Sequence, residues 1–393
     1  MAGAAPVKIG VLVFPPRLVS TSTPASRLPI AVIGVGLIGR AHVARALASP
    51  EVSIAAIADP TEAGRAFAAG LNLPWYADHR AMLDTVKPAA AIVATPNATH
   101  LTIGLDCIAR GIVTLMEKPV ADTVANARRL CDAATAAGVA LLTGHQRRHN
   151  PIVRRARQLV NEGVLGRPVS ATAMSVWLKP APYFDTTWRR EPGGGPVLIN
   201  LIHDIDLLRH LLGDIVTVQA ITSNRVRGFA VEDTAAVLLQ FANGALGTVS
   251  VSDSVAAPWN YDLAAGEQAQ YPRQDVDSHY LCGTEGSLTL PRLQVWRYRG
   301  TSGGTSDVTS GGTSNGTSNG TSGDARGWTE PLSLERTPVH TANPYDEQLR
   351  HLRAVVEGRE KPLCSGIDGL KTLEATQAVL TAGASGQAVH LSA

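Results

Sequence analysis

The chain has 393 residues, of which 45% are hydrophobic and 17% are charged, and its formal net charge is +2. This length accommodates two domains with a core each, and this charge balance gives no general attraction to nucleic acid or to a membrane surface. The four cysteines are scattered without a Cys-x-x-Cys pair, which argues against a disulfide framework or a metal site. We therefore expect a cytoplasmic protein without a bound metal.

Residues 1–28 are expected to form a flexible N-terminal arm. The apolar run 9–14 is short and is ended by Pro15 and Pro16, so it lacks the length of a secretory signal. No run approaches the roughly 20 apolar residues that a membrane-spanning helix requires. The sequence therefore predicts neither export nor a membrane partner.

A glycine-rich loop follows the apolar segment 30–33, which is typical of a buried strand, and precedes a helical segment at 40–47. The loop has the pattern Gly-x-Gly-x-x-Gly and contains Gly34, Gly36, Leu37, Ile38 and Gly39. In this context the glycines allow a tight turn, a close approach of the backbone to a pyrophosphate, and close packing of helix on strand. The free amides at the helix start face the phosphates. The loop predicts a dinucleotide site, and the alternative is a glycine turn without a cofactor.

A second apolar strand, 52–58, ends at Asp59, twenty residues after Gly39. A carboxylate at this position accepts hydrogen bonds from the adenosine ribose and repels a 2′-phosphate. The sequence therefore favours NAD over NADP as the cofactor. Arg65 lies close in the sequence and softens this preference, which keeps NADP open as an alternative.

Strands and helices alternate up to residue 150. Further strands are expected at 89–94, 111–116 and 140–143, with helices at 101–110 and 124–137 between them. This alternation predicts an α/β Rossmann domain with a doubly wound parallel sheet over residues 29–150. The ends of its strands line the ligand crevice, and the residues there that we expect to contact the cofactor are Thr95, Pro96, Asn97, His100, Glu117 and Lys118.

Residues 151–393 are expected to form a second, α+β domain for substrate binding and oligomerisation. Long alternating segments, with a hairpin signal at Asn243 and Gly244, predict a large and mostly antiparallel open sheet with helices on one side. Helices are expected at 344–358 and 367–385. Residues 300–324 repeat threonine, serine and glycine with almost nothing apolar to bury, which predicts a disordered insertion.

Within this domain, residues 197–213 are expected to form one helix that is apolar on most of its surface. Asn200, His203, Asp206 and His210 recur at spacings of three and four and therefore share a face. A polar stripe on a buried helix needs partners or a wet cavity. Taken alone, such a histidine is more often a satisfied core residue, but in a chain with a dinucleotide site His203 becomes a candidate proton carrier.

Four segments together carry a resemblance to a known family: GVGLIG, ATPNATH, MEKPV and GGGPVLINLIHDIDLLRHLLG. In their order and spacing, from residue 29 to the C-terminus, the chain resembles the glucose–fructose oxidoreductase, inositol dehydrogenase and MocA family (Gfo/Idh/MocA). The resemblance implies a dehydrogenase or reductase that acts on a hydroxyl or ketone of a sugar, cyclitol or related ring. It also implies a homodimer or homotetramer formed through the C-terminal sheet.

Residue by residue, the resemblance assigns the family's motif lysine to Lys118 and its motif histidine to His203. It also implies a cis peptide bond between Lys118 and Pro119. Many members carry an aspartate four residues before the histidine, and this chain has Ile199 there. Asn200 or Asp206 is expected to take over as the hydrogen-bonding partner of His203.

These residues suggest a mechanism in which His203 accepts the proton of a ring hydroxyl while hydride leaves the adjacent carbon. Lys118 donates to the substrate oxygen and stabilises the developing alkoxide, and Asn200 completes the candidate catalytic set. The residues that we expect to contact the substrate are Arg148, Tyr183, Trp188, Asn200 and His203. For the first three, a packing or surface role is an equally open interpretation.

Two other functions remain open at this point. The first is a family enzyme that uses NAD for a transient oxidation without net redox change, as in elimination or glycoside cleavage. The second is a non-catalytic dinucleotide-binding sensor, which Ile199 mildly favours and the retention of Lys118 and His203 opposes.

Overall fold

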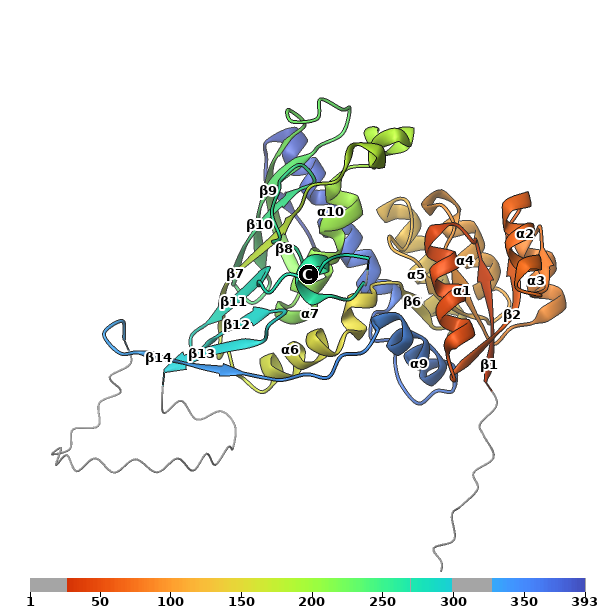
Figure 1. Ribbon diagram of the computed structural model, residues 1–393, viewed down its shortest axis with the longest axis horizontal. Helices are drawn as coiled ribbons and strands as arrows, with labels where there is room; N and C mark the ends of the chain where they lie inside the picture. The colour runs from red at the N-terminus through yellow and green to blue at the C-terminus, as the bar shows by residue number, and fades with distance from the viewer. Residues whose placement is uncertain (1–26, 269, 299–326, 393) are drawn as a thin grey trace, which may run out of the picture.

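The structure is a computed structural model and describes residues 27–268, 270–298 and 327–392. Nearly all of the predicted N-terminal arm and the whole predicted insertion at 300–324 lie outside these residues. Within the described ranges, the chain forms two sheets that stand side by side with helices between them (Figure 1).

The first sheet has six parallel strands in the order β3-β2-β1-β4-β5-β6. Its strands are β1 (Leu28–Ile33), β2 (Val52–Ala58), β3 (Trp75–Tyr76), β4 (Ala90–Val93), β5 (Val113–Met116) and β6 (Leu141–Thr143). Its helices are α1 (Leu37–Ala48), α2 (Glu62–Gly70), α3 (His79–Val86), α4 (His100–Ile108) and α5 (Val124–Ala137). The predicted doubly wound sheet is confirmed, and its strand order reverses between β1 and β4, where open α/β sheets bind ligands.

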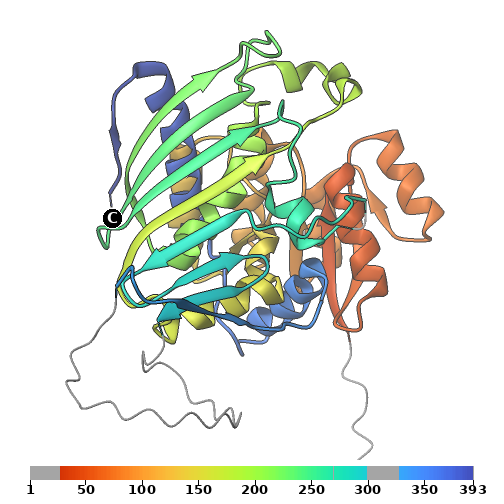
Figure 2. The ribbon, with the colours of Figure 1, turned by 60° about the vertical axis from the view of Figure 1, so that its left-hand side comes forward.

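The second sheet has nine strands in the order β14-β13-β12-β11-β7-β10-β9-β8-β15. These strands are β7 (Pro168–Val176), β8 (Ile215–Ser223), β9 (Thr234–Phe241), β10 (Leu246–Ser252), β11 (His279–Gly283), β12 (Ser287–Leu290), β13 (Gln294–Tyr298), β14 (Leu332–Arg336) and β15 (Val389–His390). Only the β7–β10 pair is parallel among these described strands, so the prediction of a mostly antiparallel sheet is confirmed. Figure 2 shows this sheet as a broad curved layer with helices behind it.

Three helices cover the inner face of the second sheet: α6 (Pro151–Asn161), α7 (Ile202–Leu212) and α10 (Gly366–Ser385). On this face, alternate strand residues such as Val237, Leu239 and Val249 pack against Leu208 and Val379 in one core. The alternation of apolar and polar residues along β9 and β10 therefore records which side of the sheet faces the helices.

The C-terminal part of the chain returns to the first domain. Helix α9 (Pro344–Val356) places Leu349 and Leu352 in the same core as Ile30 and Val52 of the parallel sheet. Helix α10 brings Leu373 into the core on the other face of that sheet. Both sheets therefore share helices, and the second half of the chain fixes the position of the first.

The expected helix at 197–213 begins differently from a regular α-helix. Residues Val197–Leu201 form a π-helical turn, and α7 follows as a regular α-helix. The backbone N–H of Val197 donates to Glu232 at 3.1 Å at the start of this turn. Because a π-turn is wider than an α-turn, Asn200 within it does not continue the straight stripe of His203, Asp206 and His210 on α7. Such turns are frequent at functional sites.

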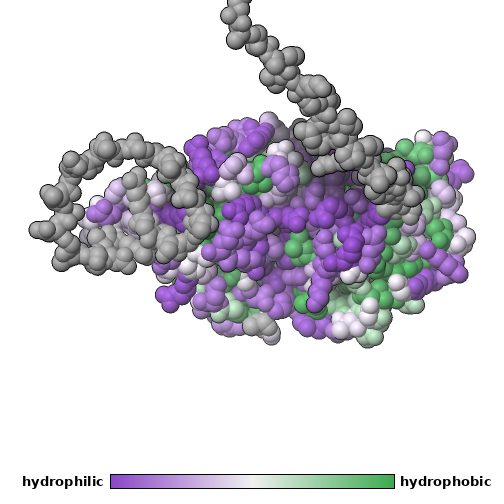
Figure 3. All heavy atoms as spheres, turned by 90° about the horizontal axis from the view of Figure 1, so that it is seen from below, coloured by the Kyte–Doolittle hydropathy of each residue, from purple (hydrophilic) through white to green (hydrophobic). Residues whose placement is uncertain are grey.

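The side of the molecule seen from below in Figure 1, where α6 and α9 lie, is hydrophilic over most of its area (Figure 3). The apolar residues of these two helices, including Val153, Leu349 and Leu352, are buried. None of the described helices is long and apolar enough to cross a membrane.

Candidate active site

The glycine loop lies at the mouth of a cavity of about 1060 Å³. Its lining combines the loop with the ends of β2 and β4 and includes Gly34, Gly36, Leu37, Asp59, Thr95 and Pro96. Gly34 has a φ of 86°, and a Cβ on Gly39 would lie 2.0 Å from the carbonyl oxygen of Gly34, so both positions require glycine. A Cβ on Gly36 would meet nothing within 4 Å, because this residue faces the cavity.

These features fit a dinucleotide. The cavity follows the carboxyl ends of the first strands, and the N-terminus of α1 opens onto it. The loop, Asp59, Thr95 and Pro96 are therefore placed together as predicted. Ile38 is in the first turn of α1 and 40% exposed, and Asn97 is exposed in a short 3-10 turn; neither lines the cavity.

Asp59 closes the loop as well as facing the cavity. Its carboxylate accepts hydrogen bonds from the backbone N–H of Val35 at 2.9 Å and from both the N–H and the hydroxyl of Thr61. Although burial works in the opposite direction, the hydrogen bonds from Thr61 and Val35 lower the pKa of Asp59. The carboxylate thus carries a negative charge at the ribose end of the cavity. Arg65 is held on the surface by Glu62.

Two predicted cofactor residues support the site from behind. His100 is fully buried, with Nδ1 2.9 Å from the carbonyl oxygen of Pro119 and Nε2 3.0 Å from that of Thr95, so it ties two strand ends together. One carboxylate oxygen of Glu117 lies 2.7 Å from His42 Nε2, and the other accepts a hydrogen bond from the backbone N–H of Lys118. Against the effect of burial, the His42 contact lowers the pKa of Glu117. Both residues hold the segment that carries Lys118.

Lys118 follows β5, and its peptide bond to Pro119 is cis, as the resemblance implied. The side chain crosses from the first domain to the second, where Nζ donates to the carbonyl oxygen of Ile199 at 3.2 Å. Burial lowers the pKa of Lys118, and the nearby charge of Glu117 acts in the opposite direction. The lysine therefore contacts the very residue that occupies the position of the expected acid, through its backbone.

His203 lies one turn further along, at the start of α7, and is partly exposed. Its Nδ1 is buried without a hydrogen-bond partner among the described residues. Burial, with further contributions from Lys118 and Arg147, lowers its pKa well below the usual value for histidine. His203 is consequently neutral at pH 7 and able to accept a proton.

The expected partners of His203 are engaged elsewhere, which corrects that part of the sequence interpretation. The side-chain oxygen of Asn200 accepts from Lys179 at 2.7 Å. Asp206 receives two hydrogen bonds from Arg148, at 2.8 and 2.9 Å. The ring that does face His203 belongs to His145, edge-on at 6.0 Å between centroids. The π-turn changes the helical spacing between Asn200 and His203. Asp206 lies with His203 on the regular helix α7, and it is engaged by Arg148 instead.

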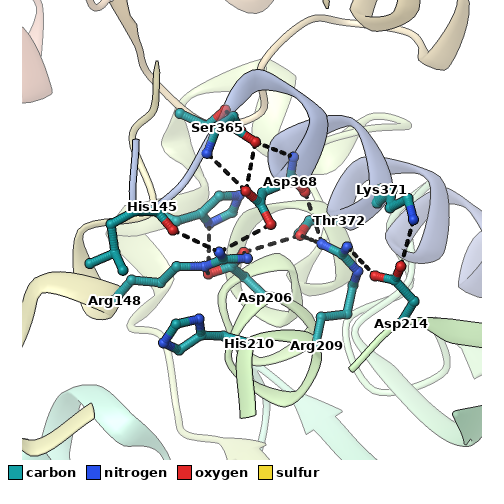
Figure 4. Close-up of polar contacts among 12 residues, drawn as sticks. His145, Arg148, Asp206, Arg209, His210, Asp214, Ser365, Asp368, Lys371 and Thr372 are labelled. Carbon is teal, nitrogen blue, oxygen red and sulfur yellow. Dashed lines mark hydrogen bonds and ion pairs between the residues drawn. The ribbon is translucent and has the colours of Figure 1, made fainter. Parts of the chain in front are cut away.

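Arg148 forms the centre of a buried polar network between the domains (Figure 4). Besides Asp206, its guanidinium contacts Asp368 at 3.2 Å and the carbonyl oxygen of Leu363. The residue is 3% exposed, and although burial acts in the opposite direction, Asp206 raises its pKa well above the usual value. The donors of the predicted substrate contact Arg148 are thus used within the protein, where they tie the exit of the first domain to α7 and α10.

Tyr183 and Trp188 lie on two short 3-10 turns after β7, at Ala181–Asp185 and Thr187–Arg190. The Tyr183 ring has the Lys179 ammonium 4.7 Å and the Arg189 guanidinium 3.9 Å from its centroid. Trp188 is about half exposed. Lys179 thus connects this segment to Asn200, because its ammonium contacts both the Tyr183 ring and the Asn200 side chain. The segment is suited to contact a ligand near Asn200.

Lys179 is a site residue that sequence reasoning missed. It follows β7 by three residues and precedes Pro180, just as Lys118 follows β5 and precedes Pro119. A second Lys-Pro pair after an apolar strand was the available signal. Among the described residues, no group of three or more His, Cys, Asp or Glu side chains is arranged to hold a metal ion.

Comparison with known proteins adds two family matches. A family described as oxidoreductases with an NAD-binding Rossmann fold matches residues 28–145, and the GFO/IDH/MocA C-terminal domain matches residues 153–289. Together these matches cover the first sheet, strands β7 to β11 of the second sheet, and the segments that carry Lys118, Lys179 and His203.

Several curated relatives span most of the chain. The rhizopine catabolism protein MocA of Rhizobium meliloti is 32% identical over 232 residues, which is 58% of this chain and 71% of that protein. The 1,5-anhydro-D-fructose reductase of Ensifer adhaerens is 29% identical over 303 residues (77% and 79%). Inositol 2-dehydrogenase 2 of Saccharopolyspora erythraea is 30% identical over 291 residues (70% and 77%).

Solved structures share the fold. The WlbA dehydrogenase of Bordetella pertussis, solved with NADH and UDP-GlcNAcA, superposes with a TM-score of 0.69 at 19% identity, covering 94% of this chain and all of that one. An oxidoreductase of Agrobacterium radiobacter, solved with NAD⁺, L-tartaric acid and magnesium, gives a TM-score of 0.72 at 18% identity (93% and 98%).

Proposed function

Since this chain belongs to the Gfo/Idh/MocA family of NAD-binding oxidoreductases, we propose that it transfers hydride between NAD and a hydroxyl or ketone of a sugar, cyclitol or related compound, with Lys118 and His203 as its catalytic residues. The observation that carries the assignment is that Lys118 contacts the π-turn that directly precedes the helix turn carrying His203. Lys118 reaches Ile199 from the first domain, and His203 stands four residues further along the same segment.

The cofactor end of the site is built by the glycine loop, Asp59, Thr95 and Pro96. NAD, when bound, supplies the hydride acceptor for oxidation. The N-terminus of α1 would hold the pyrophosphate, and the Asp59 carboxylate would accept from the ribose hydroxyls. The Asp59 carboxylate supports NAD over NADP because it would repel a 2′-phosphate, while Arg40 lines the same cavity.

At the substrate end, His203 takes the proton of the reacting hydroxyl. Its lowered pKa keeps the imidazole neutral at pH 7, so it acts as the base in the oxidation direction. The Lys118 ammonium donates to the same oxygen and stabilises the negative charge that develops on it. Its hydrogen bond to Ile199 and the support of Glu117 hold Nζ in place for this role.

The outer face of the second sheet supports a homodimer or homotetramer. Its side chains include exposed apolar residues on several neighbouring strands: Val169, Ile221, Leu238, Leu246, Tyr280 and Trp296. An apolar surface that spans neighbouring strands is typical of a protein interface. Light scattering after size exclusion gives the assembly, and Leu238→Glu with Leu246→Glu should dissociate it.

We place the enzyme in the cytoplasm, where its four free cysteines, three of them buried, stay reduced. Fractionation of cells that produce the protein tests this placement.

The function is tested by a screen of polyols, sugars, sugar acids and cyclitols with NAD, followed by absorbance of NADH. Turnover that depends on added NAD supports the proposal. Turnover without net NADH formation, by protein that retains NAD through purification, identifies the non-redox alternative. Binding of NAD without turnover of any compound indicates a sensor instead.

A further inference from the structure

Two lysines from different domains meet consecutive residues of the π-turn. Lys118 donates to the backbone carbonyl of Ile199 at 3.2 Å, and Lys179 donates to the side-chain oxygen of Asn200 at 2.7 Å. The first contact is part of the proposed catalytic set. The second has no role in that mechanism, although it acts on a residue beside the reacting groups.

Lys179 is held firmly in this position. The residue is 6% exposed, its ammonium lies over the Tyr183 ring, and Nζ is 3.7 Å from the Asp253 carboxylate. Asp253 is shared, because Arg227 Nε also donates to it at 2.8 Å. Because Lys179 and Arg227 share one carboxylate, Lys179 has an N–H group left that donates to Asn200.

This bond decides which way the amide of Asn200 faces. A lysine ammonium has three donors and no acceptor, so the amide must turn its oxygen toward Lys179. The amide nitrogen, Nδ2, then faces away from the lysine. Asn200 is partly exposed, and the bond from Lys179 is its only side-chain hydrogen bond among the described residues. Lys179 thereby leaves the two N–H groups of the Asn200 amide as free donors.

The acidic groups around this turn already accept from protein donors. Glu117 is used by His42 and by the Lys118 N–H, and Glu232 is used by the Val197 N–H. Asp253 is used as described above. The donors that lie beside neutral His203 are the Lys118 ammonium and the Asn200 amide. Ile199 supplies no side-chain acceptor where the family resemblance implies an aspartate.

We propose that Lys179 is a positioning residue that presents the Asn200 amide as a donor, and that the site consequently selects a polyol or sugar bearing a carboxylate. Such an anion accepts hydrogen bonds from Asn200 and is attracted by the Lys118 ammonium, whereas a neutral cyclitol gains hydrogen bonds without this charge attraction. This inference rests on the proposed oxidoreductase function and specifies its substrate class.

The experiment compares matched pairs of compounds, glucuronate with glucose and galactonate with galactitol, as substrates of the full-length protein with NAD. The wild-type protein should have a kcat/KM at least about tenfold higher for the acid of the preferred pair, since a hydrogen bond to a charged group carries at least that factor. A higher kcat/KM for the neutral members of both pairs overturns the inference and leaves the oxidoreductase function standing. No NAD-dependent turnover of any compound overturns both.

Two variants test the positioning role. Asn200→Asp still accepts from Lys179 but replaces the outward donor with an acceptor, so the preference for the acid should fall at least about tenfold. Lys179→Met frees the amide to rotate, and KM for the acid should rise about tenfold while kcat changes less. Lys179→Arg keeps a donor at this position and should restore part of the loss.

The matched control is Lys361→Met. Lys361 is exposed and also precedes a proline, and both substrate classes should be unaffected by its loss. If Lys179→Met instead raises KM equally for acids and neutral compounds, the residue is merely structural and the inference fails. Should Lys179→Met not fold, Lys179→Arg and Asn200→Asp still decide the question.

Discussion

Nζ of Lys118 lies 3.2 Å from the carbonyl oxygen of Ile199, the residue that stands four positions before His203. The lysine of the first domain is therefore anchored to the backbone of the second, at the position where the family resemblance implies an aspartate. Without that charge, the burial of the His203 ring and the nearby cations Lys118 and Arg147 lower the pKa of His203 well below its usual value.

The first prediction concerns this missing acid. Ile199→Asp places a carboxylate near His203 and favours the imidazolium, so the acid limb of kcat/KM for oxidation should move upward by about one pH unit. The wild-type limb should lie below pH 6.5. Ile199→Asn, which has the same shape without the charge, serves as the control. If the acid limb of kcat/KM lies at the same pH in both variants, a charge at residue 199 does not affect the pKa of His203.

The second prediction separates the cofactor-binding role of Gly36 from the packing role of Gly39. A methyl group on Gly36 meets only the cavity, whereas one on Gly39 would lie 2.0 Å from the Gly34 carbonyl oxygen. Gly36→Ala should retain the wild-type unfolding temperature and lose about tenfold or more in NAD affinity, measured by calorimetric titration. Gly39→Ala should lower the unfolding temperature. Unchanged NAD affinity in Gly36→Ala would refute this cofactor site.

The third prediction concerns Arg148 and separates a structural from a substrate-binding role. Arg148→Met leaves Asp206 buried without its partner, and urea unfolding should show a loss of about 3 kcal/mol or more in the free energy of unfolding. Arg65→Met, which breaks an exposed pair with Glu62, should leave the free energy of unfolding almost unchanged, because solvent screens such a pair. A stable Arg148→Met with a raised substrate KM would instead favour direct contact.

The fourth prediction concerns the pH dependence of substrate binding. Burial lowers the pKa of Lys179 to about 8, against the attraction of Asp253 and with added repulsion from Arg227 and Lys118. Below that pH the ammonium holds the Asn200 oxygen, and above it the contact weakens. KM for a carboxylate-bearing substrate should therefore rise above about pH 8. In Lys179→Arg, whose guanidinium stays protonated, this rise should disappear; its persistence would assign the limb to another group.

Much of the first domain follows from local sequence. The segment from β1 through Asp59 contains a buried strand, a Gly-x-Gly-x-x-Gly turn and a helix in that order. This order is typical of a dinucleotide site, so the fold and the cofactor site could be predicted together. The hairpin at Asn243 and Gly244 is equally local, with Gly244 at a φ of 87°. These features depend on neighbours in the chain, which the sequence displays directly.

The interior of the site depends on contacts that the sequence does not display. The π-turn at Val197–Leu201 changes the helical period between Asn200 and His203, and Asp206, on the regular helix α7, pairs with Arg148. Arg148 meets Asp206 and Lys179 meets Asn200 across domains or between distant segments. Only tertiary packing determines which buried cation pairs with which acceptor.

The most direct test of the account is the turnover of Lys118→Ala and His203→Ala on a substrate found in the screen. Folding and NAD affinity must first be shown to equal those of the wild-type protein, so that any loss belongs to the chemical step. The account predicts that kcat falls about 100-fold or more in each variant, as expected when a positioned acid–base group is removed. Turnover within about threefold of wild type in either variant would contradict the catalytic role of that residue.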